Sequence, residues 1–132
     1  MTLGDPVRGA ALYTRLRLTL PRRTAGFSLP RFLEGAAASR PFADGPGAIW
    51  GMKLAERVLE RLPIRRTCYF RSLARFAVLR RAGVPVTFVM GVRDGAPDIE
   101  GHAWLALDGG SWGEPAPSDF VPTFTFPARA VP

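Results

Sequence analysis

Hydrophobic positions divide the chain into a helical first part and a later part with the pattern of strands. Between Arg8 and Leu20, apolar residues recur every four positions and also alternate, so either a helix or a strand fits, and we expect a helix that Pro21 ends. One or two further helical turns are expected over 27–34. Residues 36–47 are rich in Gly and Pro, which predicts a loop and the best internal boundary of the chain.

The helical signals are stronger beyond residue 47. Over 48–62, apolar residues populate one broad face and charged residues the remainder, which predicts an amphipathic helix that Pro63 closes. A second helix is predicted from Thr67, a suitable N-cap residue, through a basic last turn to Gly83.

The remainder of the chain predicts a small sheet. A mostly buried strand is expected over 84–92, a loop over 93–101 and a second strand over 102–107. The Asp-Gly-Gly sequence at 108–110 predicts a hairpin turn into a return strand over 111–114, and the Pro-rich tail is expected to be extended and irregular. Helices followed by antiparallel strands indicate an α+β fold, with the helices packed on a small antiparallel sheet.

Length and composition limit the class of protein. A chain of 132 residues holds a single domain with a modest core, and 47% hydrophobic and 11% aromatic residues are normal for a soluble globular fold. Uncharged stretches are too short for a transmembrane helix. Asp5, Pro6 and Arg8 stand where a signal peptide has an apolar run, and a lone cysteine cannot close an intrachain disulfide, so we expect a cytoplasmic protein.

The net charge of +7 comes almost wholly from arginine, because Lys53 is the one lysine among 18 basic residues. The arginines occur as scattered pairs rather than as one stripe between exposed aromatic residues, and no nucleic-acid motif accompanies them. We therefore expect no nucleic-acid partner. A solvated basic surface that attracts an acidic peptide or protein fits the charge equally well.

The chain has one cysteine, Cys68, and one histidine, His102, and both stand where catalysis can use them. A cysteine in the first turn of a helix faces unpaired backbone N–H groups that favour the thiolate and can bind an oxyanion. His102, at the start of the next strand, can transfer the proton. A third group must orient the imidazole, and Glu114 is the ionisable residue that the hairpin returns opposite His102.

Each of these residues also has a plain structural interpretation. A lone cysteine on an apolar helix can be a small buried hydrophobe, the histidine a hydrogen-bonded core or edge-strand side chain, and the glutamate a solvated charge. Three further residues are candidates for substrate binding, with a core aromatic and a local scaffold as the alternatives: Trp104, Arg71 and Ser72.

Four short segments, taken in order, carry a resemblance to a known family. They are the run from Cys68 to Ala74, the sequence Leu-Arg-Arg-Ala-Gly-Val-Pro at 79–85, Gly-Val-Arg at 91–93, and His-Ala-Trp at 102–104 followed by Asp-Gly. Over residues 48–115 they resemble the transglutaminase-like cysteine peptidase of lasso-peptide biosynthesis. The resemblance implies a transglutaminase-like, papain-like peptidase core over 48–132, preceded by a helical or irregular segment over 1–47.

The resemblance also implies a catalytic triad. The family's cysteine, histidine and acid fall on Cys68, His102 and Glu114. The acid is commonly aspartate in such relatives, so Glu114 departs from the pattern, and Asp108 and Asp119 are the alternatives. The implied reaction is attack of the Cys68 thiolate on the peptide carbonyl at the leader–core junction, protonation of the leaving amine by His102, and hydrolysis of the acyl-enzyme by water. This chemistry requires no metal or other cofactor, and no cluster of metal ligands is visible in the sequence.

The family implies the partners. Its precursor leader is gripped by a small recognition domain, fused or separate, and 47 residues before the matched region leave no room for a fused copy. We therefore expect the precursor peptide and a separate recognition protein as partners, with the lasso cyclase as a further candidate and no membrane. The Arg-rich segment 1–27 is a candidate docking element. Two other function classes stay open: transamidation or deamidation by the same thiol, and a catalytically silent binding module.

Overall fold

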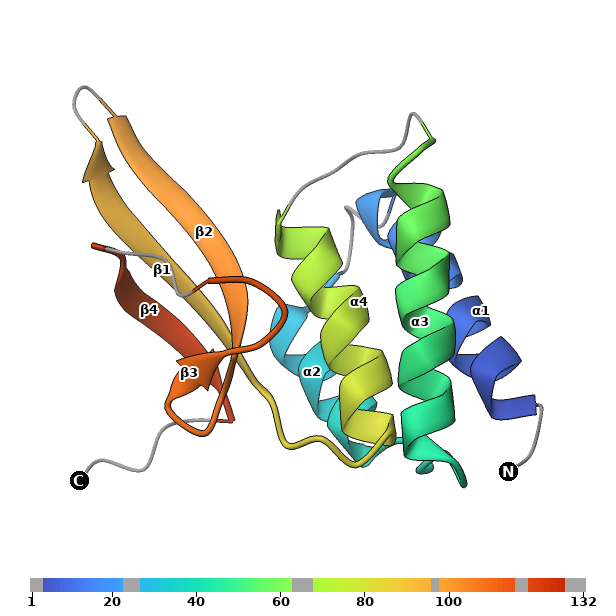
Figure 1. The fold of residues 1–132 in the computed structure, drawn as a ribbon. Helices are drawn as coiled ribbons and strands as arrows, with labels where there is room; N and C mark the ends of the chain where they lie inside the picture. Colours follow the sequence, from blue (N-terminus) through green and yellow to red (C-terminus); the bar gives the residue numbers. More distant parts are fainter. Residues whose placement is uncertain (1–3, 23–26, 63–67, 96–97, 116–118, 128–132) are drawn as a thin grey trace.

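The computed structural model describes residues 4–22, 27–62, 68–95, 98–115 and 119–127. The described part of the chain forms four α-helices packed on a four-stranded antiparallel sheet (Figure 1), which confirms the α+β prediction. The helices come first and the strands follow: α1 Gly4–Thr19 with a 3₁₀ turn at Leu20–Arg22, α2 Leu29–Ala38, α3 Gly45–Leu59, α4 Cys68–Arg81, β1 Thr87–Gly95, β2 Asp98–Leu107, β3 Gly110–Ser111 and β4 Val121–Phe126. No helix in these ranges is long and apolar enough to cross a membrane.

The helix boundaries are set by their caps. The loop expected over 36–47 is shorter than predicted, because α2 continues to Ala38 and α3 begins at Gly45. Asp44 caps α3 by accepting a hydrogen bond from the backbone N–H of Gly47, and a proline occupies the first turn. Gly and Pro therefore mark the start of a helix here, where a missing N–H costs nothing, and do not mark a long loop. Pro63 and Thr67, expected at the ends of α3 and α4, lie outside the described residues.

The helix expected near the amino terminus is confirmed, and it is part of the core. Helices α1 and α3 approach closely because two glycines face backbone, Gly9 against Ala48 and Gly51 against Pro6. Helix α4 lies between these helices and the sheet, with contacts to α1, α2, α3, β1 and β2. The core draws on all of them, and it crosses the boundary expected at residue 47: Tyr13, Leu16, Leu33, Met52, Leu73, Phe76, Leu79, Phe88 and Leu105 are buried in one cluster.

The sheet has the order β3-β2-β1-β4 and is larger than predicted. The loop expected over 93–101 is wrong, since β1 and β2 stay paired until Gly95 faces Asp98. The tail is also more regular than expected, because β4 pairs with β1. The far end of the β1–β2 hairpin is largely exposed, with an ion pair between Arg93 and Glu100 and an exposed Ile99, so no regular hydrophobic alternation marks these strand ends.

The hairpin turn at Asp108 is confirmed. Asp108 and Gly109 have positive φ angles of 50° and 83°, as a two-residue type I′ turn requires. The return strand is shorter than the predicted 111–114, because β3 comprises only Gly110–Ser111. Gly113, with a φ of 80°, then turns the chain out of the sheet. This turn directs the residue that follows, Glu114, back toward the helices.

Candidate active site

Cys68 is the first residue of α4 and is half-buried at the margin of the hydrophobic core. One helical turn later, Ser72 is buried and its hydroxyl donates a hydrogen bond of 3.2 Å to the carbonyl oxygen of Ala103. Ala103 is the neighbour of His102 in β2. Residues four apart share one side of a helix, so the thiol lies on the side of α4 that faces β2. The Ser72 hydroxyl thus fastens the start of α4 to the strand that carries the histidine.

The structure brings Glu114 to His102. Its Oε1 atom lies 3.9 Å from Nε2 of the imidazole, and its Oε2 atom accepts a hydrogen bond of 3.0 Å from Nη2 of Arg71. The distance to the imidazole is longer than a hydrogen bond, a spacing that catalytic groups often show before substrate binds. Arg71 comes from α4, so its guanidinium joins the acid to the helix that begins with Cys68.

The other candidate acids lie elsewhere. Asp108 is in the hairpin turn and exposed, and Asp119 is exposed with a φ of 66°. Neither makes a described contact with His102, whereas Glu114 does. Within the described ranges, no hydrogen bond joins the Cys68 thiol to the imidazole. The structure therefore groups His102, Glu114 and Arg71, and it places Cys68 one turn ahead of Arg71 on α4.

Aromatic rings enclose the imidazole. Trp104 stacks on His102 with ring centroids 5.7 Å apart and an interplanar angle of 19°, and Phe120 lies 5.4 Å away. Gly91 pairs with His102 across β1 and β2, and a methyl group there would come within 2.8 Å of Cη2 of Trp104. The missing side chain at Gly91 thus leaves room for the tryptophan beside the histidine. Sequence reasoning missed Phe120, because it lies in the segment expected to be irregular.

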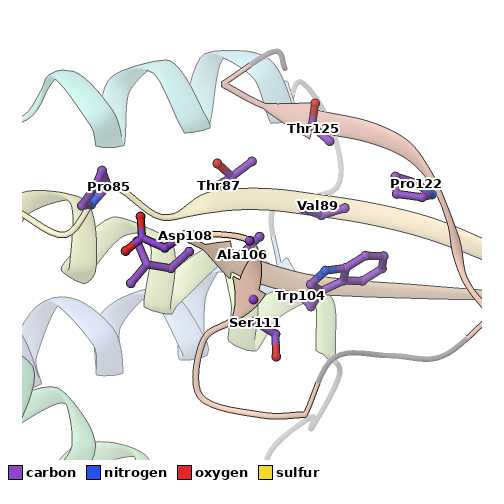
Figure 2. Close-up of a pocket in the computed structure, with 12 residues that line it drawn as sticks. Pro85, Thr87, Val89, Trp104, Ala106, Asp108, Ser111, Pro122 and Thr125 are labelled. Carbon is purple, nitrogen blue, oxygen red and sulfur yellow. The ribbon is translucent and has the colours of Figure 1, made fainter. Parts of the chain in front are cut away.

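A depression of about 360 Å³ lies on the same face of the sheet (Figure 2). Trp104 forms part of its wall, and other lining residues come from three strands: Thr87, Val89, Ala106 and Thr125. Apolar side chains at alternate positions, Phe88 and Leu105 among them, point to the opposite face and into the helices. One tryptophan therefore touches both the depression and the catalytic histidine candidate.

The described residues contain no candidate metal-binding site. Across the ranges that the structure describes, no three His, Cys, Asp or Glu side chains are grouped closely enough to hold a metal ion.

Comparison with known families places the chain in a superfamily. The family model of the transglutaminase-like superfamily matches residues 10–125. The chain belongs to the transglutaminase-like superfamily. No curated protein and no solved structure gives a significant match. The matched region begins inside α1 and ends inside β4, so this transglutaminase-like domain includes the first two helices and the last strand as well as the candidate site. Proteins of this superfamily are often thiol enzymes.

An ion pair between α3 and α4 lies next to the candidate site of the transglutaminase-like domain. Arg75, one turn after Arg71, donates hydrogen bonds of 2.8 and 2.6 Å from Nε and Nη2 to the two carboxylate oxygens of Glu56 in α3. The hydroxyl of Tyr13 in α1 donates to the same carboxylate. The guanidinium of Arg75 also lies 5.6 Å from the ring centroid of Trp112, two residues before Glu114. Two successive turns of α4 thus hold the segment that carries the acid.

In this ion pair, burial and hydrogen bonding shift the pKa values in opposite directions. Burial acts to raise the pKa of Glu56, but hydrogen bonds from Arg75 and Tyr13 outweigh it and hold the pKa below its usual value. Burial likewise acts to lower the pKa of Arg75, and the bonds to Glu56 raise it. Burial and the carboxylate both raise the pKa of Tyr13, so the phenol stays neutral and donates. Sequence reasoning missed this network, because its members are far apart in the chain and no motif marks them.

Proposed function

We propose that this transglutaminase-like protein is a cysteine endopeptidase that removes the leader from a lasso-peptide precursor. The observation that carries the proposal is the grouping of His102, Glu114 and Arg71 beside the helix that begins with the sole cysteine. The resemblance of the Cys68, Gly91 and His102 segments to the lasso-peptide leader peptidases supports the choice of substrate.

The geometry suggests a role for each group. Glu114 faces Nε2 of His102, which leaves Nδ1 to exchange a proton with the thiol. The thiolate of Cys68 attacks the carbonyl carbon at the leader–core junction, and the unpaired N–H groups of the first turn of α4 stabilise the oxyanion. The C–N bond breaks as His102 gives its proton to the core amine. Water, deprotonated by His102, then releases the leader acid and regenerates the thiol.

The surroundings of the triad suggest how substrate binds. The stack of Trp104 on His102 forms an apolar wall beside the imidazole, and the depression of about 360 Å³ that shares this wall can receive a side chain next to the scissile bond. The precursor peptide and a separate recognition protein are the proposed partners, with the lasso cyclase as a further one.

A transamidase or deamidase is the second candidate. The superfamily match supports it, because the same acyl-enzyme forms and an amine can replace water as the second nucleophile, or a glutamine side chain can replace the peptide bond. The mass of the product separates the candidates, since hydrolysis yields free leader and core whereas transamidation yields a joined product. Alkylation of Cys68 distinguishes both enzymes from a silent binding module. It should abolish the activity of either enzyme, whereas a binding module has no thiol-dependent activity for alkylation to remove.

The test is incubation of the protein with a candidate precursor and recognition protein, followed by mass spectrometry. Cys68→Ala should abolish cleavage and His102→Ala should reduce kcat by about 1,000-fold or more. Glu114→Gln should lower kcat by about 100-fold or more and change the pH profile, because the imidazole loses its orienting charge. Asp108→Asn and Asp119→Asn are matched controls that should retain the parent rate. Cleavage by Cys68→Ala at the parent rate would refute the mechanism, and a large effect of Asp119→Asn alone would reassign the acid.

A further inference from the structure

The outer side of α3 carries an unusual row of exposed apolar side chains. Trp50, Leu54 and Val58 are 59%, 40% and 60% exposed, and Leu62, in the turn that continues the helix, is 45% exposed. Single exposed apolar residues are normal on a protein surface, but a contiguous row of large ones marks an interaction site. A spacing of four residues places them along one ridge of the helix, about 18 Å long.

A second row beside this ridge is cationic. Lys53, Arg57 and Arg61 are exposed and have the same spacing of four. Each cation follows an apolar residue by three positions. Three steps of about 100° are about 60° short of a full circle, so the cationic row lies about 60° around the helix from the apolar ridge. Glu60 is the one exposed acid on this side of the helix. The surface formed by the apolar ridge and the cationic row therefore has a net positive edge.

We propose that this α3 surface docks an amphipathic helix of a partner protein whose apolar side chains are edged by carboxylates. A ridge of residues four apart is the feature that packs into the groove of another helix. A second copy of this chain fits poorly, because it would bring the same cations together in a protein of net charge +7. Carboxylates on the partner complement Arg57 and Arg61 and exclude partners with a basic edge.

The α3 surface is continuous with the segment that carries Glu114. Lys53 lies 5.8 Å from the ring centroid of Trp112. Lys53 and Arg57 also line a depression of about 460 Å³ together with Trp112 and Gly113, and the other lining residues are Glu56, Glu60 and Arg75. A docked helix thus lies beside the turn that directs Glu114 toward His102. The docking itself does not depend on the proposed cleavage.

Binding is measured with the Cys68→Ala protein, so that a failure of the cleavage proposal leaves the result intact. The probes are a labelled synthetic helix of about 18 residues with a leucine ridge edged by glutamates, the same peptide with lysines in place of the glutamates, and vesicles of phosphatidylglycerol and phosphatidylcholine. Fluorescence anisotropy for the peptides and sedimentation for the vesicles report binding. The glutamate peptide should bind, and the lysine peptide should bind at least about tenfold more weakly.

Variants locate the site. Leu54→Glu with Val58→Glu should weaken binding of the glutamate peptide at least about tenfold. Arg57→Glu with Arg61→Glu should reverse the preference between the two peptides.

The control variants make the same kinds of substitution at exposed positions outside the α3 surface. Ile99→Glu alters an apolar residue that is 72% exposed at the far end of the β1–β2 hairpin. Arg31→Glu with Arg40→Glu makes the same change in net charge as Arg57→Glu with Arg61→Glu, on exposed residues of α2 and the loop after it. Both should leave the affinity within about twofold, since surface changes outside a contact have small effects. Equal thermal unfolding of all variants establishes that they fold. The proposal is overturned if the glutamate peptide does not bind, if the ridge variants bind it as the parent does, or if only the vesicles bind.

Discussion

Replacing Glu56 by alanine should destabilise the protein strongly, although the residue touches neither Cys68 nor His102. Glu56 and Arg75 have side chains that are only 14% and 10% exposed, and two short hydrogen bonds join them. The substitution leaves the guanidinium of Arg75 buried without its counter-charge, a change that typically costs about 3–5 kcal/mol. The remaining exposure admits some water, so we expect a loss of about 3 kcal/mol in the free energy of unfolding.

That loss is large for a domain of this size. Domains are usually stable by about 5–15 kcal/mol, and the thermal midpoint should fall by about 10 °C. Urea unfolding followed by circular dichroism at pH 7 measures the free energy. Glu34→Ala, which removes an exposed carboxylate from α2, is the matched control and should change it by less than about 0.5 kcal/mol.

A double variant separates the ion pair from simple loss of packing. Glu56→Leu with Arg75→Met removes both charges, leaves no buried ion unpaired, and should be more stable than the sum of the two single changes predicts. A loss below about 1 kcal/mol for Glu56→Ala, or purely additive effects in the double variant, would refute the assignment of the pair as a buried support.

The pH dependence gives an independent check. The folded protein holds the pKa of Glu56 below the 4.5 of an unperturbed glutamate, so the unfolded state binds the proton more readily. The stability that this carboxylate contributes is present above pH 4.5 and is lost as the pH falls through the lowered pKa. The difference in stability between the parent and Glu56→Gln should therefore narrow below pH 4.5. A constant difference across that range would contradict the lowered pKa.

Two pairs of glycine substitutions test the packing. Gly91→Ala should lower the free energy of unfolding by about 1–3 kcal/mol, because the new methyl group would come within 2.8 Å of the Trp104 ring. Its control is Gly101→Ala in the next strand, where a methyl group meets nothing within 4 Å and should change the free energy of unfolding by less than about 0.5 kcal/mol. Gly35→Ala in α2 is equally open and should stabilise the protein by up to about 1 kcal/mol, but Gly51→Ala should destabilise it, since its methyl group would collide with the backbone of α1. Urea unfolding measures all four, and equal behaviour within either pair would contradict the close contacts.

Residues of the segment 1–27 are part of the hydrophobic core, and this limits how its proposed role in docking can be tested. Tyr13, Leu16 and Leu20 of this segment are buried in the main hydrophobic cluster. Deletion of residues 1–27 would therefore unfold the domain and not report on docking alone. Substitution of exposed residues, such as Arg15→Glu, is the informative experiment, because the side chain lies on the surface of α1.

Local patterns in the sequence predicted the two helices observed as Gly45–Leu59 and Cys68–Arg81, apart from their exact ends, and the Asp108–Gly109 turn, because helical periodicity and the φ preference of Asp-Gly are properties of neighbouring residues. They also identified the thiol at the start of a helix. The strand β4 and the outer half of the β1–β2 hairpin could not be predicted in this way. The outer half of the hairpin is exposed on both faces, and in β4 Phe124 and Phe126 pack against the core, which is too short a pattern for periodicity to identify, so pairing defines these strands.

Only the tertiary structure decided what surrounds these elements. The turn at Gly113 brings Glu114 within reach of His102 and of Arg71, which is 43 residues away in the chain. The same packing buries Glu56 against Arg75 and leaves Leu54 and Val58 exposed, although periodicity placed them on one broad face with the buried Met52 and Leu59. Such contacts depend on the path of the whole chain, because a helix pattern specifies a face but not the neighbour that covers it.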